Sequence, residues 1–419
     1  MTTVNQCPIQ KRQRLYPFAA LLATLLMPQV SSAIGFLLPN QDPAAIARGN
    51  AFAATADNPS AIYYNPAGIT QITGWEVQVG ELNYLGIHSH YQPAGGGPDV
   101  NSEFEVTPVP QIYAVYSPTN LPLSFGLGVY APFGLGIEWP ANSSLRTLDI
   151  EARMQFLTVN PVVAWKILPS LSIAAGPAFN YSTLKFQRGL FSQFDEYTFD
   201  GHDYSIGGTL GIRWQPCDQL AFGVDYRSES TMNYTGRSSY RPGNGMVLNV
   251  PTTTSTALPQ ELSWGISYRP TAHWNVESDV EWDNTHRTGV LTLDGTSALF
   301  GSNLPFQLNW HDTWMYKFGV TRYFGDGWFV SAGYFFTTST TSEQNFTPAI
   351  PDTQLHTGSL GFGRDGEHWH WAVAGQIIAG PDRSIATTTG NNNPFTGASP
   401  AGKYSLFIPS LSISVGYKF

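Results

Sequence analysis

Apolar and polar residues alternate strictly along the end of the chain. Five apolar side chains, Leu411, Ile413, Val415, Tyr417 and Phe419, are separated by small or polar ones. Because successive side chains of a β-strand point to opposite faces, this alternation predicts a strand with one apolar and one polar face. Such a strand suits the wall of a transmembrane barrel, with lipid outside, a polar lumen inside and an aromatic residue at the interface. Such a strand also occurs in soluble domains, so the choice between a membrane barrel and a soluble domain depends on the rest of the chain.

Strand-like alternation recurs from Trp75 onward in fourteen segments. They are residues 75–87, 107–117, 123–130, 150–167, 171–186, 204–215, 220–234, 260–269, 274–285, 312–323, 328–338, 353–364, 368–378 and 408–419. Six connections are short, at residues 118–122, 168–170, 216–219, 270–273, 324–327 and 365–367, and they alternate with seven long ones. Outer-membrane barrels have an even number of strands, short periplasmic turns and long outer loops. This order predicts an all-β, 14-stranded antiparallel transmembrane barrel with both chain ends in the periplasm.

The segment at residues 274–285 separates its charges from its apolar residues. Trp274, Val276, Val280 and Trp282 share one face, whereas the other face carries Asn275, Glu277, Asp279, Glu281 and Asp283. Four carboxylates cannot face hydrocarbon, where an unpaired charge is costly, so this face points into the lumen. The carboxylates either bind a cation or pair with other residues inside the barrel, and we favour pairing.

The N-terminus has the features of a secretory signal peptide. Lys11, Arg12 and Arg14 precede an apolar run at residues 15–27, and small residues follow at 31–33. The run is shorter than the roughly 20 residues that a membrane-spanning helix needs. We therefore expect a signal peptide at residues 1–33 and a mature chain from Ile34. The alternative is a buried N-terminal helix.

The composition narrows the class of protein. After residue 33 no stretch approaches 18 consecutive apolar residues, which excludes a helical membrane protein. Charged residues make up 12% of the chain, about half of the usual share, and aromatic residues make up 14%. A secreted all-β protein remains an alternative, although its surface would carry more charge. The net charge of −9 argues against nucleic acid as a partner.

Residues 34–74 do not show the alternation of the barrel. They are rich in Ala, Gly, Asn and Pro, and their only charged residues are Asp42, Arg48 and Asp57. A disordered leader would carry more charge and fewer Ile, Phe and Tyr residues. We therefore expect a compact plug in the lumen at residues 34–74 and the transmembrane barrel at residues 75–419.

Several short motifs then resemble one family. Gly35-Phe36, Ala47-Arg-Gly-Asn-Ala51 and residues 54–70, which include Asn65-Pro66-Ala67, resemble the N-terminal hatch of the FadL family of outer-membrane transporters for long-chain fatty acids and other hydrophobic compounds. Further matches lie in the barrel, at residues 134–138, 226–229, 258–261 and 350–352. Each motif alone is weak, but their order and spacing cover the whole mature chain.

The resemblance implies a transport route. Substrate would be captured among the outer loops, enter an apolar pocket beside the hatch, and leave through a gap in the wall after hatch rearrangement. In the family the gap comes from an inward kink of the third strand, which here contains Gly126 and Gly128. Glycine within a strand permits a bend or a close approach of backbone. The alternative is that these glycines only make room for a neighbouring side chain.

The resemblance also suggests residues that bind ligand. The family has basic residues near its pocket, and Arg188 is the position most similar to one of them. A second basic position falls at His311, where histidine replaces lysine and leaves the acidity of the ligand open. Arg188 has an alternative role as a cation at a loop base or facing lipopolysaccharide. Phe300 and Phe306 lie in an apolar loop that either collects substrate or packs against other loops.

The sequence thus favours passive transport of hydrophobic small molecules across the outer membrane of a Gram-negative-type bacterium. Long-chain fatty acids are the preferred substrate and neutral hydrocarbons the alternative. A general porin, an outer-membrane hydrolase and an adhesin or receptor are alternatives of other classes. We assign no residue to catalysis, a cofactor or a metal. The expected partners are the ligand, membrane lipid, lipopolysaccharide and, through Phe419, the barrel assembly machinery.

Overall fold

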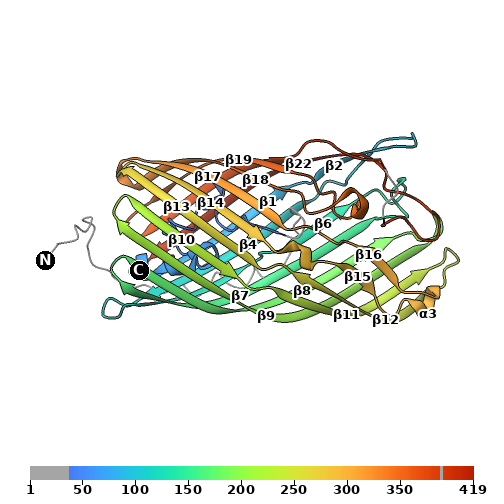
Figure 1. Cartoon of the computed structure of the whole chain (residues 1–419), viewed down its shortest axis with the longest axis horizontal. Coiled ribbons are helices and arrows are strands. Elements are labelled where there is room, and N and C mark those ends of the chain that lie inside the picture. The colour runs from blue at the N-terminus through green and yellow to red at the C-terminus, as the bar shows by residue number, and fades with distance from the viewer. Residues whose placement is uncertain (1–36, 387–389) are drawn as a thin grey trace.

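The alternating segments form the wall of a closed antiparallel barrel in the computed structural model, which describes residues 37–386 and 390–419 (Figure 1). The helices are α1 (Pro43–Ile46), α2 (Ala61–Tyr64), η1 (Pro66–Gln71), η2 (Thr285–Arg287), α3 (Ser297–Phe300), η3 (Gly325–Gly327) and η4 (Glu343–Asn345). The strands are β1 (Gly74–Leu85), β2 (His88–Pro93), β3 (Val100–Asn101), β4 (Val106–Ser117), β5 (Leu123–Tyr130), β6 (Gly134–Glu138), β7 (Glu151–Leu168), β8 (Leu171–Arg188), β9 (Glu196–Cys217), β10 (Leu220–Arg227), β11 (Ser230–Arg241), β12 (Leu248–Leu258), β13 (Glu261–Thr271), β14 (Trp274–Asp283), β15 (Val290–Leu293), β16 (Leu304–Gln307), β17 (Thr313–Tyr323), β18 (Trp328–Thr337), β19 (Leu355–Asp365), β20 (Trp369–Ala379), β21 (Arg383–Ile385) and β22 (Gly402–Lys418).

The wall has fourteen strands, as predicted. Six are interrupted and consist of two pieces each, namely β1 with β2, β3 with β4, β5 with β6, β10 with β11, β12 with β13, and β20 with β21. The other eight are β7, β8, β9, β14, β17, β18, β19 and β22. The barrel closes where β1 pairs with β22, with Val79 opposite Val415. Closure removes the unpaired strand edges that lipid would not tolerate. Among the described residues, no helix is long and apolar enough to cross a membrane.

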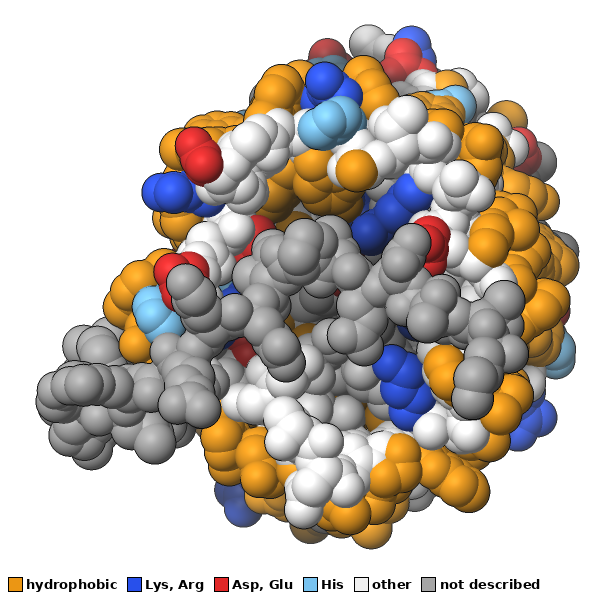
Figure 2. All heavy atoms as spheres, turned by 90° about the vertical axis from the view of Figure 1, so that its left-hand side faces the viewer, with side chains coloured by type: hydrophobic (Ala, Val, Ile, Leu, Met, Phe, Trp, Pro, Cys, Tyr) orange, Lys and Arg blue, Asp and Glu red, His pale blue; other side chains and the backbone are white. Residues whose placement is uncertain are grey.

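The alternation places apolar side chains outside and polar ones inside. On β14, the side chain of Val276 is 48% exposed to the surroundings, whereas Glu277 and Asp279 are each 1% exposed and face the lumen. Figure 2 views the end of the barrel that carries the short turns and the C-terminus, and shows hydrophobic side chains around its circumference. The long connections, including α3 and the β15–β16 hairpin, lie at the other end (Figure 1). By the usual arrangement of such barrels, that end is extracellular.

Residues 37–73 lie within the barrel and are almost entirely buried. Two of their three short helices, α1 and η1, have side-chain caps. The Asp42 carboxylate accepts a hydrogen bond from the Ala45 N–H at 3.2 Å, and the Asn65 amide oxygen accepts one from the Ala67 N–H at 3.1 Å. Such caps satisfy backbone donors that a helix start leaves without partners. We call this segment the plug.

Two carboxylates of the wall bind the backbone of the plug. Asp279 accepts hydrogen bonds from the N–H groups of Phe52 (2.7 Å) and Ala53 (2.9 Å), and Glu277 accepts them from Ala54 (2.7 Å) and Thr55 (3.1 Å). Hydrogen bonds to charged groups contribute about 1.5–3 kcal/mol each. The structure therefore supports pairing, rather than cation binding, for these two carboxylates.

Candidate functional site

The lumen face of the barrel changes from polar to apolar towards the extracellular end. Along the inward face of β8, Asn180 and Ser182 are followed by Leu184 and Phe186, and all four are buried. On the outer face of the same stretch stand the polar residues Thr183 and Lys185, so the alternation inverts here. An apolar lumen face does not suit a water-filled pore and indicates another function. An apolar lining removes hydrophobic ligands from water.

These wall residues and the loops above them form one apolar cluster. Its members from the wall include Met154, Phe156, Leu184, Phe186, Phe199, Met232, Tyr234, Leu258 and Met315. The loops contribute Trp139, Leu145, Leu148, Leu291, Leu293, Leu304, Phe306 and Leu308. Several loop members belong to the β15–β16 hairpin, in which Leu293 pairs with Leu304. These side chains pack against one another as a hydrophobic core, and we call the set the apolar chamber. Of its residues the sequence identified only Phe306.

Arg188 ends β8 at the side of the apolar chamber. It is only 6% exposed, and its guanidinium carbon lies 4.8 Å from the centroid of the Phe306 ring. Phe306 in turn stacks on Phe186 at 4.9 Å. Within the described part of the chain, the guanidinium has no hydrogen bond or ion pair, and its Nε is buried without a partner. An unpaired buried charge is costly, so this group is available to an anion.

Asp149 lies in the loop before β7, close enough to Arg188 to interact with its charge. This carboxyl is 3% exposed, and its Oδ2 has no hydrogen-bond partner among the described residues. Burial raises the pKa of the Asp149 carboxyl well above its usual range, and the charge of Arg188 opposes that rise only in part. A protonated Asp149 leaves Arg188 free. No sequence signal distinguished Asp149 from other loop carboxylates.

An aromatic group surrounds Phe300 at the extracellular rim of the chamber. The ring of Phe300 lies 5.9 Å from Tyr197, 5.2 Å from Tyr240, 6.2 Å from Phe191 and 5.8 Å from Phe395. Phe191 is 46% exposed. The structure thus brings Arg188, Phe300 and Phe306 to one region, since Phe306 belongs to the chamber and Phe300 packs against it.

His311 is placed differently from these three residues. Its side chain is exposed, and its backbone N–H donates to the carbonyl of Thr340 at 2.8 Å. Its carbonyl accepts a hydrogen bond from the hydroxyl of Thr285. The neighbouring Trp310 is the buried member of this loop segment, at 3% exposed. A ligand role for His311 therefore stays a prediction without a supporting contact.

The third wall strand is interrupted, but not at the two glycines. Gly126 and Gly128 pair regularly with Val115 and Tyr113 of β4, and pairing between β4 and β5 ends after Val129. A Cβ at Gly126 would lie 2.9 Å from Cδ1 of Ile62 in the plug, and one at Gly128 would lie 2.8 Å from Cγ2 of the same residue. The glycines therefore make room for Ile62, and the interruption lies at residues 131–133.

A cleft in the wall accompanies this interruption. β6 pairs only with β7, so residues 106–111 of β4 have no strand partner on that side. The interruption between β5 and β6 instead meets the plug, because the N–H of Leu38 donates to the Pro132 carbonyl at 2.8 Å and Gln41 Nε2 donates to the Ala131 carbonyl at 2.6 Å. The cleft is narrow, with a volume of about 20 Å³, and it is lined by Leu38, Pro108, Val109, Pro110, Ala131, Phe133, Gly134, Met154, Gln155, Phe156 and Leu157.

Pro108 and Pro110 suit an edge without a strand partner. Alternate residues of a strand direct their N–H groups to the same neighbour, and proline has no N–H to donate. Two prolines at these positions therefore remove two donors from one edge of β4. Because β1 pairs with the whole of β4, the cleft side is the edge that tolerates this loss.

A second cavity lies at the periplasmic side of the plug. Its volume is about 120 Å³, and its lining includes seven charged residues: Asp42, Arg48, Asp57, Glu76, Arg364, Asp365 and Lys418. Figure 2 shows charged side chains near the middle of this end of the molecule. The two openings thus differ in chemistry, because charged side chains take part in the lining of the periplasmic cavity and none lines the wall cleft.

The remaining hatch residues of the sequence prediction fall into two groups. Gly35 and Phe36 lie outside the described residues, as do the expected signal peptide residues 1–33. Asn65 is 0% exposed, and its Nδ2 donates to the carbonyls of Ala53 (2.7 Å) and Ile212 (2.9 Å). Pro66 and Ala67 begin η1 directly after it. Asn65 therefore ties the plug both to itself and to β9.

Comparison with known proteins agrees with this architecture. The family of outer membrane transport proteins described as OMPP1/FadL/TodX matches residues 24–377. A Neisseria meningitidis serogroup B protein, named as an outer membrane protein, is 24% identical over 362 residues, which cover 71% of this chain and 75% of that protein.

Solved structures with the same fold include proteins from Pseudomonas and Ralstonia species. A FadL homologue from Pseudomonas aeruginosa has a TM-score of 0.80 at 17% identity and covers 92% of this chain and 100% of its own. The toluene transporter TodX from Pseudomonas putida has a TM-score of 0.70 at 15% identity, with 92% and 100% covered. The toluene transporter TbuX from Ralstonia pickettii has a TM-score of 0.66 at 16% identity, with 91% and 100% covered.

Proposed function

We propose a substrate and a route for this chain from the premise that it belongs to the OMPP1/FadL/TodX family of outer membrane transport proteins. It is accordingly an outer-membrane β-barrel that transports hydrophobic compounds and is not an enzyme. A hydrolase is thereby excluded. A general porin would need an open lumen, whereas here the plug fills part of it.

Long-chain fatty acids are the substrate that we propose. The observation that carries this proposal is the buried guanidinium of Arg188, which lies beside the apolar chamber without a hydrogen-bonded partner among the described residues. A fatty acid supplies a carboxylate for the guanidinium and a tail for the chamber. Each buried methylene gains about 0.8 kcal/mol, so a long tail binds far better there than in a water-filled pore.

Neutral aromatic hydrocarbons are the second candidate, and one contact favours them. The Phe306 ring under Arg188 already stabilises the guanidinium, since cation–π contacts contribute about 0.5–2 kcal/mol. A neutral ligand would then need only the chamber. Two proteins of similar fold are toluene transporters.

Lateral exit is the route that we propose after the chamber. Met154 and Phe156 belong both to the chamber and to the lining of the wall cleft, so an apolar ligand can pass between them without crossing charged groups. The alternative, through the plug, leads to the cavity lined by charged residues. Transfer of a tail from apolar to charged surroundings loses the free energy that its burial gained.

Four features of the wider molecule are also proposals. We propose that residues 1–33 are removed as a signal peptide and that residues 34–74 act as a hatch that rearranges during transport. We also propose that Phe419 serves recognition by the barrel assembly machinery, and that lipid and lipopolysaccharide surround the wall. Phe419 lies at the barrel end, where its N–H donates to the carbonyl of Trp75 at 3.0 Å.

The test is uptake of radiolabelled oleate and toluene by outer-membrane vesicles that contain the protein, measured against vesicles that lack it. We expect faster uptake of oleate. Uptake of toluene alone would replace the fatty acid with a neutral hydrocarbon as substrate. Uptake of neither, together with conductance of small ions or sugars, would support a porin.

A further inference from the structure

The lumen wall beside the plug holds more negative than positive side chains. Direct cross-strand partners place Glu261 of β13 between Arg227 of β10 and Asp283 of β14. Two residues before Asp283 on β14, Glu281 also faces the lumen and lies opposite Ser263 of β13. All of these residues except Ser263 are charged, and all are buried. Like charges that lie directly opposite on neighbouring strands destabilise a sheet, so the Glu261–Asp283 pair needs compensation.

Two of the three carboxylates have a basic partner. Arg227 Nη1 donates to Glu261 Oε2, and Lys317 Nζ donates to Glu281 Oε2 at 2.7 Å. Both cations are themselves buried, at 6% and 3% exposed. Arg227 is shared with Asp225, whose Oδ2 lies 3.5 Å from its Nη2, so the two cations leave none for the third carboxylate.

Asp283 is the carboxylate without a basic partner. It is 0% exposed, and the hydroxyl of Thr313 donates to its Oδ2 at 3.1 Å. Among the described residues, neither Asp283 Oδ1 nor Glu261 Oε1 receives a hydrogen bond, although both atoms are buried. A buried carboxylate oxygen without a donor is destabilising, which points to a missing positive partner.

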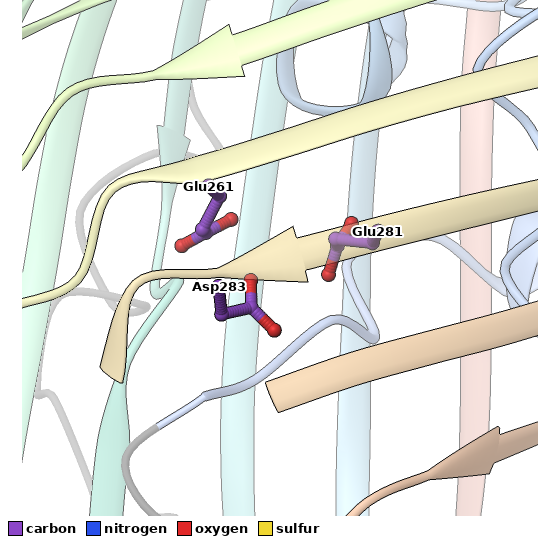
Figure 3. Close-up of side chains that lie close together, drawn as sticks. All are labelled: Glu261, Glu281 and Asp283. Carbon is purple, nitrogen blue, oxygen red and sulfur yellow. The ribbon is translucent and has the colours of Figure 1, made fainter. Parts of the chain in front are cut away.

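The three carboxylates converge on one point. One oxygen from each of Glu261, Glu281 and Asp283 lies within 4.8 Å of the others. Figure 3 shows their side chains approaching one another from β13 and β14. Carboxylate oxygens in such a group are the ligands that Ca²⁺ and Mg²⁺ prefer. We propose that Glu261, Glu281 and Asp283 hold a hard divalent cation, Ca²⁺ or Mg²⁺, in the lumen wall.

This proposal divides the acidic face of β14 into two functions. Glu277 and Asp279 bind the plug backbone, whereas Glu281 and Asp283 take part in the cation site. It also revises the expectation that no residue holds a metal. Glu281 lies opposite Met315 of the apolar chamber, so the cation would sit where the chamber meets the polar part of the lumen. The cation site does not depend on which substrate is transported.

The first test is direct binding to the full chain in detergent after treatment with EDTA. Equilibrium dialysis with ⁴⁵Ca²⁺, and competition by Mg²⁺, should give one saturable site per chain at neutral pH. The apparent Tm should rise when either cation is added. If wild-type protein binds neither cation and is instead stabilised by acidification, the carboxyls share protons and the proposal is wrong.

Two variants separate this site from cations bound at the surface. Asp283→Asn keeps the shape of the side chain and should lower the cation affinity at least tenfold. Glu367→Gln removes an exposed carboxylate on a periplasmic turn and should leave both binding and the Tm increase unchanged. Equal binding by wild type and Asp283→Asn would show that the cation lies elsewhere. Direct binding of the cation to the wild-type protein tests the proposed site even if a variant folds poorly.

Discussion

Arg188 lies over the ring of Phe306, with 4.8 Å between its guanidinium carbon and the ring centroid. The contact joins the end of β8 to the β15–β16 hairpin of an outer loop. This contact stabilises the buried guanidinium of Arg188 at the border of the apolar chamber, and the N–H donors of the guanidinium are not needed for it. A ligand with a carboxylate head and an apolar tail is complementary to this arrangement, because each part finds its partner in one place.

Replacing Arg188 should separate the two candidate substrates. Arg188→Met keeps much of the packing but removes the charge, and should lower oleate affinity roughly 10- to 100-fold, the effect of losing a charged hydrogen bond of about 1.5–3 kcal/mol. Arg188→Lys should recover part of the affinity. Toluene binding should change little in either variant. Calorimetry in detergent measures both ligands, and equal losses for oleate and toluene would mean that Arg188 acts only through packing.

Oleate binding should weaken as pH rises, and Asp149 should be the cause. Its pKa is raised, so the carboxyl is neutral below that value and becomes a carboxylate above it. The carboxylate would then pair with Arg188 and repel the ligand. This loss of oleate affinity should be measured above about pH 5, because the carboxyl group of oleate is itself ionised there.

Asp149→Asn is the matched variant for this pH effect. It cannot ionise, so oleate affinity should stay constant over the same pH range and equal the low-pH affinity of wild type. Calorimetric titrations between pH 6 and pH 9 would check this. A pH dependence that persists in Asp149→Asn would assign the effect to another group.

Filling the space beside Ile62 should disturb the plug without unfolding the barrel. In Gly126→Val the new Cβ would meet Ile62 and Val162 at under 3 Å, and such overpacking costs about 1–3 kcal/mol. Oleate uptake should fall, and the added change Ile62→Ala should restore it. Gly358→Val is the control, since a Cβ there meets nothing within 4 Å. Unchanged uptake in Gly126→Val would show that the position of the plug beside β5 does not affect oleate transport.

Blocking the wall cleft should slow release while leaving binding intact. Ala131→Trp places a large side chain in the cleft lining, whereas Ala332→Trp places the same side chain on β18, where Val330 and Tyr334 mark the lipid-facing side. Only Ala131→Trp should reduce uptake of oleate into vesicles, with its affinity unchanged. Similar uptake by both variants would exclude the lateral exit.

The transmembrane wall could be predicted from the sequence because lipid imposes strict alternation. The segment predicted at 220–234 covers β10 and the start of β11, and the one predicted at 274–285 is β14 within two residues. The extracellular extensions β2, β3, β12 and β21 were missed, because strands beyond the membrane face water on one side and loops on the other. There the alternation loses its physical cause.

The candidate site could be predicted only in part. Arg188, Phe300 and Phe306 were selected from a resemblance and from loop hydrophobicity, and the structure brings them to one region. Leu184 and Phe186 were not selected, although the alternation on β8 inverts there, with Lys185 on the outer face between them, which was a visible signal for a lumen that turns apolar. Asp149 carried no signal, because its burial and its proximity to Arg188 arise only from loop packing.

The most direct test of this account is a crystal structure of the protein with 9,10-dibromostearate, located by the anomalous signal of bromine. We predict bromine density among Leu184, Phe186 and Phe199, with the carboxylate within hydrogen-bond distance of Arg188. Bromine density in the charged cavity between the plug and β22, or a carboxylate far from Arg188, would contradict the proposed site and the route that leads from it.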